Sequence, residues 1–161
     1  REMARAFGLP IVWGTSPELE GRTLSVARDA GVPAIYTEYR GGGYHPQGVQ
    51  PLVDGCLNVL KLFKMFPGKV VLDHSLGIIE DNKPGSGHLQ VMHPAPEEGL
   101  FMAEVSLGAK VSKGDRLGHL LKENGEQGAE ILAGLSGMVF LIRAVPMAKV
   151  GDALAGILPI K

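Results

Sequence analysis

The most informative chemical pattern in this chain is one carboxylate followed closely by glycines. Residues 31–43 read Gly-Val-Pro-Ala-Ile-Tyr-Thr-Glu-Tyr-Arg-Gly-Gly-Gly, so Glu38 lies near the end of an otherwise apolar run. Alternation along a strand would place Tyr36 and Glu38 on one face, and the glycines would permit close backbone approach. Ligands of open α/β sheets bind outside the carboxyl ends of the strands. The pattern therefore predicts a catalytic acid or base at Glu38.

Two neighbours are candidate substrate-binding residues. The guanidinium of Arg40 would suit a substrate carboxylate bidentately, and His45 follows the glycines closely enough to line the same pocket. A structural interpretation is also open. Arg40 would then be the ion-pair partner of Glu38 or a solvated strand end, and Glu38 an ordinary edge carboxylate.

The histidines do not form a metal-binding pattern. The sequence contains neither His-x-x-Glu nor His-Glu-x-x-His, which are spacings expected of zinc hydrolase sites. No metal ligand is therefore predicted within the chain. The histidines are interpreted as surface or packing residues rather than metal ligands, with His45 as the exception that could line the pocket. The five are His45, His74, His88, His93 and His119.

The first part of the chain alternates short apolar runs with helical patterns, which is typical of a largely parallel α/β sheet. A helix is expected to end at Gly8, where glycine suits a helix C-terminus. The further expected elements are strands at 9–13 and 32–39 and helices at 17–30 and 49–66. Together they predict the C-terminal part of an α/β domain over residues 1–69.

The later part is predicted to be a β domain over residues 87–161, after a connector at 70–86 with the boundary in 81–87. Its sequence contains a near-repeat: Gly99-Leu-Phe, Ala109-Lys-Val and Gly114-Asp against Gly137-Met-Val, Ala148-Lys-Val and Gly151-Asp. Each Gly-Asp pair suits a tight turn in which glycine takes positive φ and aspartate bonds its own backbone. The doubled unit resembles the barrel-sandwich fold of lipoyl and biotinyl carrier domains.

Composition excludes several classes of protein. A hydrophobic fraction of 45% in 161 residues supports a folded core, and a net charge of -1 gives no general attraction to nucleic acid or membranes. The single cysteine, Cys56, cannot form an internal disulfide, and no apolar stretch is long enough to span a bilayer. A soluble, cytoplasmic protein without nucleic-acid or membrane partners is predicted.

The segment leading to Glu38 resembles a known family. Glu-Leu-Glu-Gly-Arg-Thr-Leu at 18–24, Ala-Gly-Val-Pro-Ala-Ile at 30–35 and the Thr-Glu before the glycines resemble the succinylglutamate desuccinylase/aspartoacylase family. These amidohydrolases are similar in fold to zinc carboxypeptidases and close with a barrel-sandwich β domain. The resemblance covers nearly the whole chain and implies the C-terminal half of such an enzyme.

The resemblance implies a chemistry and a departure from it. It assigns Glu38 the role of general base in zinc-dependent deacylation of N-acyl amino acids or related small amides. The family's zinc ligands, a His-x-x-Glu pair and a distant histidine, precede that glutamate and have no counterpart here. The isolated chain is therefore expected to be inactive, and a half-sheet with exposed apolar edges is expected to self-associate as a homo-oligomer.

Two other functions stay open from sequence. The chain could be a non-catalytic binding or scaffold module built on a lipoyl-like barrel, which would have no use for an exposed Glu38 at a pocket. A carrier domain modified at Lys122 is the third interpretation, but that turn lacks the residues that flank carrier lysines.

Overall fold

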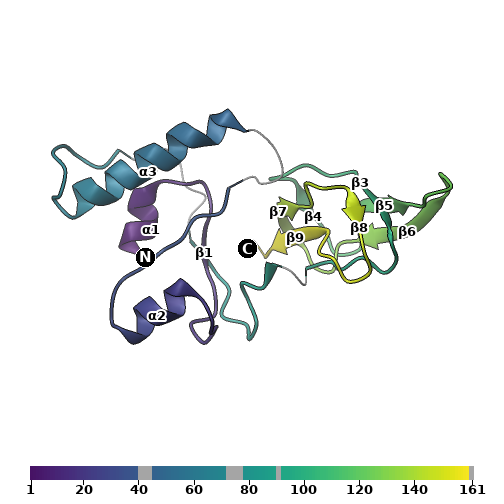
Figure 1. Cartoon of the computed structure of the whole chain (residues 1–161), viewed down its shortest axis with the longest axis horizontal. Coiled ribbons are helices and arrows are strands. Elements are labelled where there is room, and N and C mark those ends of the chain that lie inside the picture. The colour runs from purple at the N-terminus through teal and green to yellow at the C-terminus, as the bar shows by residue number, and fades with distance from the viewer. Residues whose placement is uncertain (40–44, 72–77, 90–91, 160–161) are drawn as a thin grey trace. The chain divides into compact units, whose positions relative to one another are not determined.

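The computed structural model describes residues 1–39, 45–71, 78–89 and 92–159. The chain divides into two compact units, Arg1–Gly87 and His88–Lys161 (Figure 1). Helices and parallel strands make up the first unit, and antiparallel sheets make up the second. The mixed helix and sheet class expected from the sequence is therefore confirmed.

The first unit is built around a short parallel ladder. Its elements in chain order are α1 (Glu2–Phe7), β1 (Val12–Gly14), α2 (Thr23–Asp29), the 3-10 helix η1 (Pro46–Gly48), α3 (Val49–Leu62) and β2 (Ile78–Glu80). β1 and β2 pair in parallel, with Val12 opposite Ile78 and Gly14 opposite Glu80. Because β2 falls inside the segment expected to be a connector, that segment contributes to the sheet of this unit.

Helix α1 packs against α3 through a glycine. A Cβ added to Gly55 would lie 2.3 Å from Cε1 of Phe7, so only glycine permits this approach. One turn later, the Asn58 side chain donates to the Val71 carbonyl at 2.7 Å and accepts from its amide at 3.2 Å. The expected end of α1 is confirmed, since Gly8 caps it with φ of 84°.

Two expected elements are corrected. The helix expected at 17–30 begins only at Thr23, because Gly21 has φ of 74° and Arg22 is extended. The strand expected at 32–39 is not formed, and none of its residues pairs with another described residue. Its apolar side chains are exposed, 57% for Val32 and 46% for Tyr36. A strand needs a hydrogen-bonded neighbour, which this stretch does not find in the described part of the chain.

The second unit consists of two antiparallel sheets over one core. The strands are β3 (Gly99–Ala103), β4 (Lys110–Val111), β5 (Arg116–Leu121), β6 (Gln127–Leu132), β7 (Gly137–Ile142), β8 (Met147–Ala148) and β9 (Ala155–Leu158). They form the sheets β6-β5-β3-β8 and β4-β7-β9. Phe101 and Leu120 from the first sheet share a core with Val139 and Ile157 from the second. No ladder joins the sheets within the described ranges, so the expected closed barrel is not seen.

The near-repeat expected from the sequence organises this unit. β3 pairs with β5 and β8, while β7 pairs with β9 and β4, so each repeat lends one short strand to the other's sheet. The short strands align differently in the structure and in the sequence. β4 corresponds to β8, so Lys110 matches Met147 in the structure, whereas the sequence repeat matches it with Lys149. The shift of two residues leaves the same side chains on each face of the sheet.

The two Gly-Asp turns have the conformation that the sequence predicts. Gly114 and Gly151 have φ of 94° and 87°. The Asp115 carboxylate accepts from the amide of Ser112 at 2.8 Å, and Asp152 accepts from the amide of Lys149 at 3.0 Å. Asp152 also binds Arg143 at 2.9 Å. The carboxylate of Asp115 therefore accepts one backbone hydrogen bond, whereas that of Asp152 accepts a backbone hydrogen bond and forms an ion pair.

These turns allow a graded stability test. Asp115→Ala is expected to lower the free energy of unfolding by about 1 kcal/mol, the usual net worth of one hydrogen bond. Asp152→Ala is expected to cost about 2 kcal/mol, because it also leaves Arg143 without its carboxylate. Urea unfolding measures both. Glu123→Ala in the exposed β5–β6 turn is the control, and equal losses in the two aspartate variants would contradict the assignment.

Candidate functional site

Of the three site residues predicted from the sequence, the structure describes Glu38 and His45 but not Arg40. Glu38 is exposed and forms no hydrogen bond or ion pair with another described residue. His45 is half-buried at the start of η1, where its carbonyl accepts from the amide of Gly48 at 3.1 Å. Arg40 and the triple glycine lie outside the described residues. The substrate-binding role expected for Arg40 and His45 therefore stays a prediction.

A close aromatic contact holds the chain beside Glu38. The ring of Tyr39 lies directly over Gly48, where an added Cβ would be only 1.9 Å from the Tyr39 Cε1. η1 thus packs against the residue that follows Glu38, and His45 is the N-cap of that same helix. The contact therefore places Tyr39, the neighbour of Glu38, against the helix that His45 precedes.

A hollow opens beyond the carboxyl end of β1. Its lining includes Thr15, Ser16, Leu19, Arg22, Val32 and Ala34. Val32 and Ala34 precede Glu38 by six and four residues. In an extended segment all three would share a face, because side chains alternate. The hollow lies where ligands of parallel sheets are bound.

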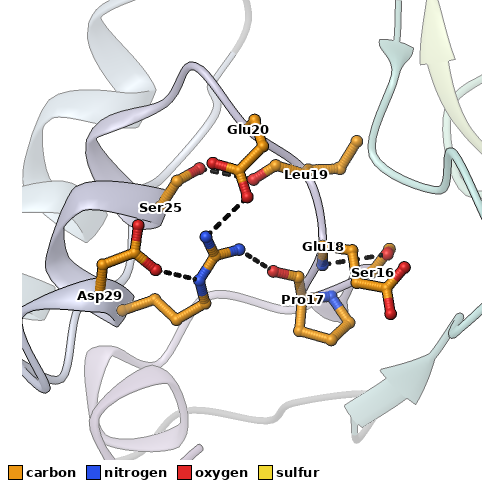
Figure 2. Close-up of polar contacts among 8 residues, drawn as sticks. Ser16, Pro17, Glu18, Leu19, Glu20, Ser25 and Asp29 are labelled. Carbon is orange, nitrogen blue, oxygen red and sulfur yellow. Dashed lines mark hydrogen bonds and ion pairs between the residues drawn. The ribbon is translucent and has the colours of Figure 1, made fainter.

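The rim of this hollow includes a polar network that engages each of the three guanidinium nitrogens of Arg28. Figure 2 labels the partners Pro17, Glu20 and Asp29. The Arg28 guanidinium donates to Glu20 and to Asp29, each at 2.8 Å, and to the Pro17 carbonyl. The hydrogen bond from Arg28 lowers the pKa of the Asp29 carboxyl below its usual value. Ser25 adds a bond to the Leu19 carbonyl at 2.5 Å. Arg28 thus fastens the loop before α2 to the helix itself.

Two charged residues at this end of the ladder have buried atoms without partners. The Nε and Nη1 atoms of Arg22 and the Oδ1 atom of Asp81 are shielded from solvent and form no hydrogen bond among the described residues. Asp81 directly follows β2, and its amide donates to the Gly14 carbonyl at 2.8 Å. The sequence prediction missed both residues, since it assigned 70–86 to a connector and placed Arg22 inside a helix.

A buried serine connects the two strand ends. The Ser86 hydroxyl accepts from the amide of Ser16 at 2.7 Å and donates to the Asp81 carbonyl at 2.6 Å. Ser16 lines the hollow, so Ser86 ties its wall to the backbone of Asp81. The donor and acceptor functions of this hydroxyl are both satisfied, and the position of Asp81 beside the hollow is fixed by backbone bonds.

The described residues do not fit a metal ion. No three side chains of His, Cys, Asp or Glu converge within the ranges that the structure covers. His93 engages both ring nitrogens structurally, Nδ1 at 2.8 Å from the Ala155 carbonyl and Nε2 at 3.0 Å from the amide of Gly134. His119 lies 2.7 Å from Glu104.

A search for membrane-spanning helices gives no candidate within the described ranges.

Known structures similar to this one share a class of enzyme. A succinylglutamate desuccinylase from Silicibacter sp. TM1040 is 25% identical, with a TM-score of 0.81 over 97% of this chain. A succinylglutamate desuccinylase/aspartoacylase from Rhodobacter sphaeroides is 26% identical, with a TM-score of 0.78 over 98% of this chain. The product-bound ectoine utilization protein EutE (DoeB) from Ruegeria pomeroyi is 24% identical, with a TM-score of 0.82 over 97%.

These similarities confirm the resemblance inferred from the sequence. Neighbours of this chain are members of the succinylglutamate desuccinylase/aspartoacylase family, and the matched region is 47%, 48% and 47% of the three structures above. The chain thus spans about half the length of these solved relatives. No protein-family model and no curated protein sequence matches it.

The Arg28 network predicts a measurable titration. Removing the guanidinium in Arg28→Gln should raise the pKa of Asp29, because the bond that holds it low is lost. In the unaltered protein the stabilisation from this pair is present above the usual carboxyl pKa and is lost as the pH falls through the lowered one. NMR titration of the Asp29 carboxyl measures the change.

Glu20→Gln is the matched control, because Glu20 bonds the same guanidinium but is not a cause of the lowered Asp29 pKa. An Asp29 pKa that stays low in Arg28→Gln would contradict the assignment.

Proposed function

We propose that this chain forms the part of a deacylase that carries its general base, Glu38, and that the enzyme hydrolyses the amide of N-acyl amino acids or related small amides. The observation that carries the proposal is the structural likeness to desuccinylase-family enzymes over nearly the whole chain. The exposure of Glu38 supports it, since a proton-transfer group must reach water and substrate, and the ring of the following residue, Tyr39, is packed against Gly48.

The proposed role of Glu38 is the transfer of one proton. Its carboxylate takes a proton from a water molecule as the water oxygen bonds to the amide carbonyl carbon. When the carbon–nitrogen bond breaks, the same proton passes to the departing nitrogen. The products are a carboxylic acid and an amine, so water is consumed and every atom is accounted for. At neutral pH the proton of the acid passes to the amine, which gives a carboxylate and an ammonium group. Arg40 and His45 are proposed to orient the substrate around this step.

Zinc dependence belongs to the proposal through the resemblance alone. The ligands would have to come from outside the described residues, because these residues do not fit a metal site. Inactivity of the isolated chain, a homo-oligomeric state and a cytoplasmic location are proposed in the same way. A barrel-sandwich form of the second unit is also proposed, on the support of its two sheets over one core.

The test is hydrolysis of N-acetyl and N-succinyl amino acids by the complete gene product, including any sequence encoded before Arg1. Glu38→Gln keeps the side chain's size and removes its basicity, so kcat/KM is expected to fall by about 10²–10⁴. Glu18→Gln, another exposed carboxylate of the first unit, is the matched control and should retain activity. Circular dichroism checks that both variants fold.

Equal activity of Glu38→Gln and the unaltered protein would rule out Glu38 as the base. If no member of the panel is hydrolysed by the complete product, the deacylase proposal fails and the non-catalytic binding or scaffold module takes its place.

A further inference from the structure

Two glycines of helix α3 and its N-cap are each covered by an aromatic ring. Gly48 is the N-cap of α3 and Gly55 lies inside the helix, so the two are seven residues, or about two turns, apart and share one face. Tyr39 lies over Gly48 and Phe7 lies over Gly55, and both glycines are buried. The residue after Glu38 therefore packs on the same helix face as the end of α1.

Space, and not backbone conformation, is the reason for glycine at these two positions. Gly48 has φ of -84° and ψ of -15°, which any residue can adopt, and Gly55 is within the regular helix. In the interior of a helix glycine is less favourable than alanine, because its backbone loses more freedom. A Cβ at either position would overlap the ring of Tyr39 or Phe7. Each glycine thus exists to admit one ring.

The packing of Tyr39 on Gly48 holds the backbone next to Glu38. The last backbone hydrogen bond before Glu38 joins the Val32 amide to the Ala27 carbonyl at 2.8 Å. Residues 33–39 form no hydrogen bond with another described residue. Because one peptide unit joins Tyr39 to Glu38, the seat of the ring limits the positions that the carboxylate can take.

Helix α3 is a firm support for this ring. Before it, the Gly48 amide donates to the His45 carbonyl at 3.1 Å, and Pro46 starts η1 with a fixed φ. Further along α3, the Asn58 side chain donates to the Val71 carbonyl at 2.7 Å and accepts from its amide at 3.2 Å. The surface that receives Tyr39 is therefore held at both ends of α3.

We propose that Gly48 is a positioning residue for the general base: it admits the Tyr39 ring, and the seated ring fixes the backbone from which the Glu38 carboxylate reaches the reacting water. The inference rests on the proposed function, which gives Glu38 its task. Gly48 and Tyr39 act through Glu38 in this role and need touch neither water nor substrate. A misplacement of about 1 Å can cost about 10²-fold in rate, so a small shift of the ring has a measurable effect.

Gly48→Ala tests the positioning role in the complete gene product with the N-acyl amino acid that it hydrolyses best. The added methyl group displaces the Tyr39 ring and with it Glu38, so kcat is expected to fall about 10–10²-fold while KM stays within about twofold. Gly55→Ala is the matched control, because its methyl group displaces Phe7 instead. Both variants should unfold at a lower temperature, but Gly55→Ala should keep its kcat.

Variants of Tyr39 assign the effect to the ring. Tyr39→Phe keeps the ring and should keep kcat, whereas Tyr39→Ala removes it and should lower kcat about as much as Gly48→Ala. In the double variant Gly48→Ala/Tyr39→Ala, the methyl group has no ring to displace. Its kcat should therefore equal that of Tyr39→Ala, which is a non-additive result. Circular dichroism checks that each variant is folded, and the two Tyr39 variants keep the test valid if Gly48→Ala does not fold.

Backbone motion at Glu38 gives a measurement that needs no hydrolysis. NMR relaxation should give the Glu38 amide an order parameter of about 0.85 in the unaltered protein and in Gly55→Ala, as for a rigid backbone. In Tyr39→Ala the order parameter should fall below about 0.6, as for a flexible one.

Three kinetic results would overturn the inference: Gly48→Ala keeps its kcat while Glu38→Gln is inactive, Gly55→Ala loses as much as Gly48→Ala, or the two losses multiply in the double variant. An unchanged order parameter in Tyr39→Ala would overturn it as well. A failure of the deacylase proposal looks different, because the unaltered protein then hydrolyses no substrate or Glu38→Gln stays active. In that case the order parameters decide whether Gly48 and Tyr39 position Glu38.

Discussion

The parallel pairing of β1 with β2 is the constraint on which the candidate site depends. The two strands lie more than sixty residues apart in sequence, and their register places the segments that follow them at the same edge. The Gly14 carbonyl then accepts from the amide of Asp81, and Ser86 extends the connection to Ser16. The ladder thus brings the backbone after β2 against residues 14–16, of which Thr15 and Ser16 line the hollow.

Much of the fold could be predicted because it depends on local signals. Gly8 ends a helix and the Gly-Asp pairs make turns, since a left-handed glycine and an aspartate that bonds nearby amides need no distant partner. The strand expected at 32–39 failed for the opposite reason. An apolar alternating run indicates only that the stretch could form a strand. Whether it pairs with another strand depends on residues elsewhere in the protein.

The same distinction governs the candidate site. Glu38 could be predicted as a site residue because the glycines after it are a sequence signal, and the structural relatives support the family that the sequence resembles. Arg22 and Asp81 were missed because nothing local marks them. Burial without a partner is a property of the tertiary structure, and the pattern around each residue predicted ordinary helix and connector instead.

Arg22 and Arg28 show how tertiary context decides the function of identical side chains. Both line one hollow and both carry a guanidinium. The guanidinium of Arg28 donates hydrogen bonds to Glu20, Asp29 and the Pro17 carbonyl, so it fixes the loop that shapes the hollow. Arg22 has buried donors that no described residue satisfies. Two identical side chains in one lining therefore differ in their surroundings: Arg28 is held by local partners, whereas buried atoms of Arg22 have no partner among the described residues.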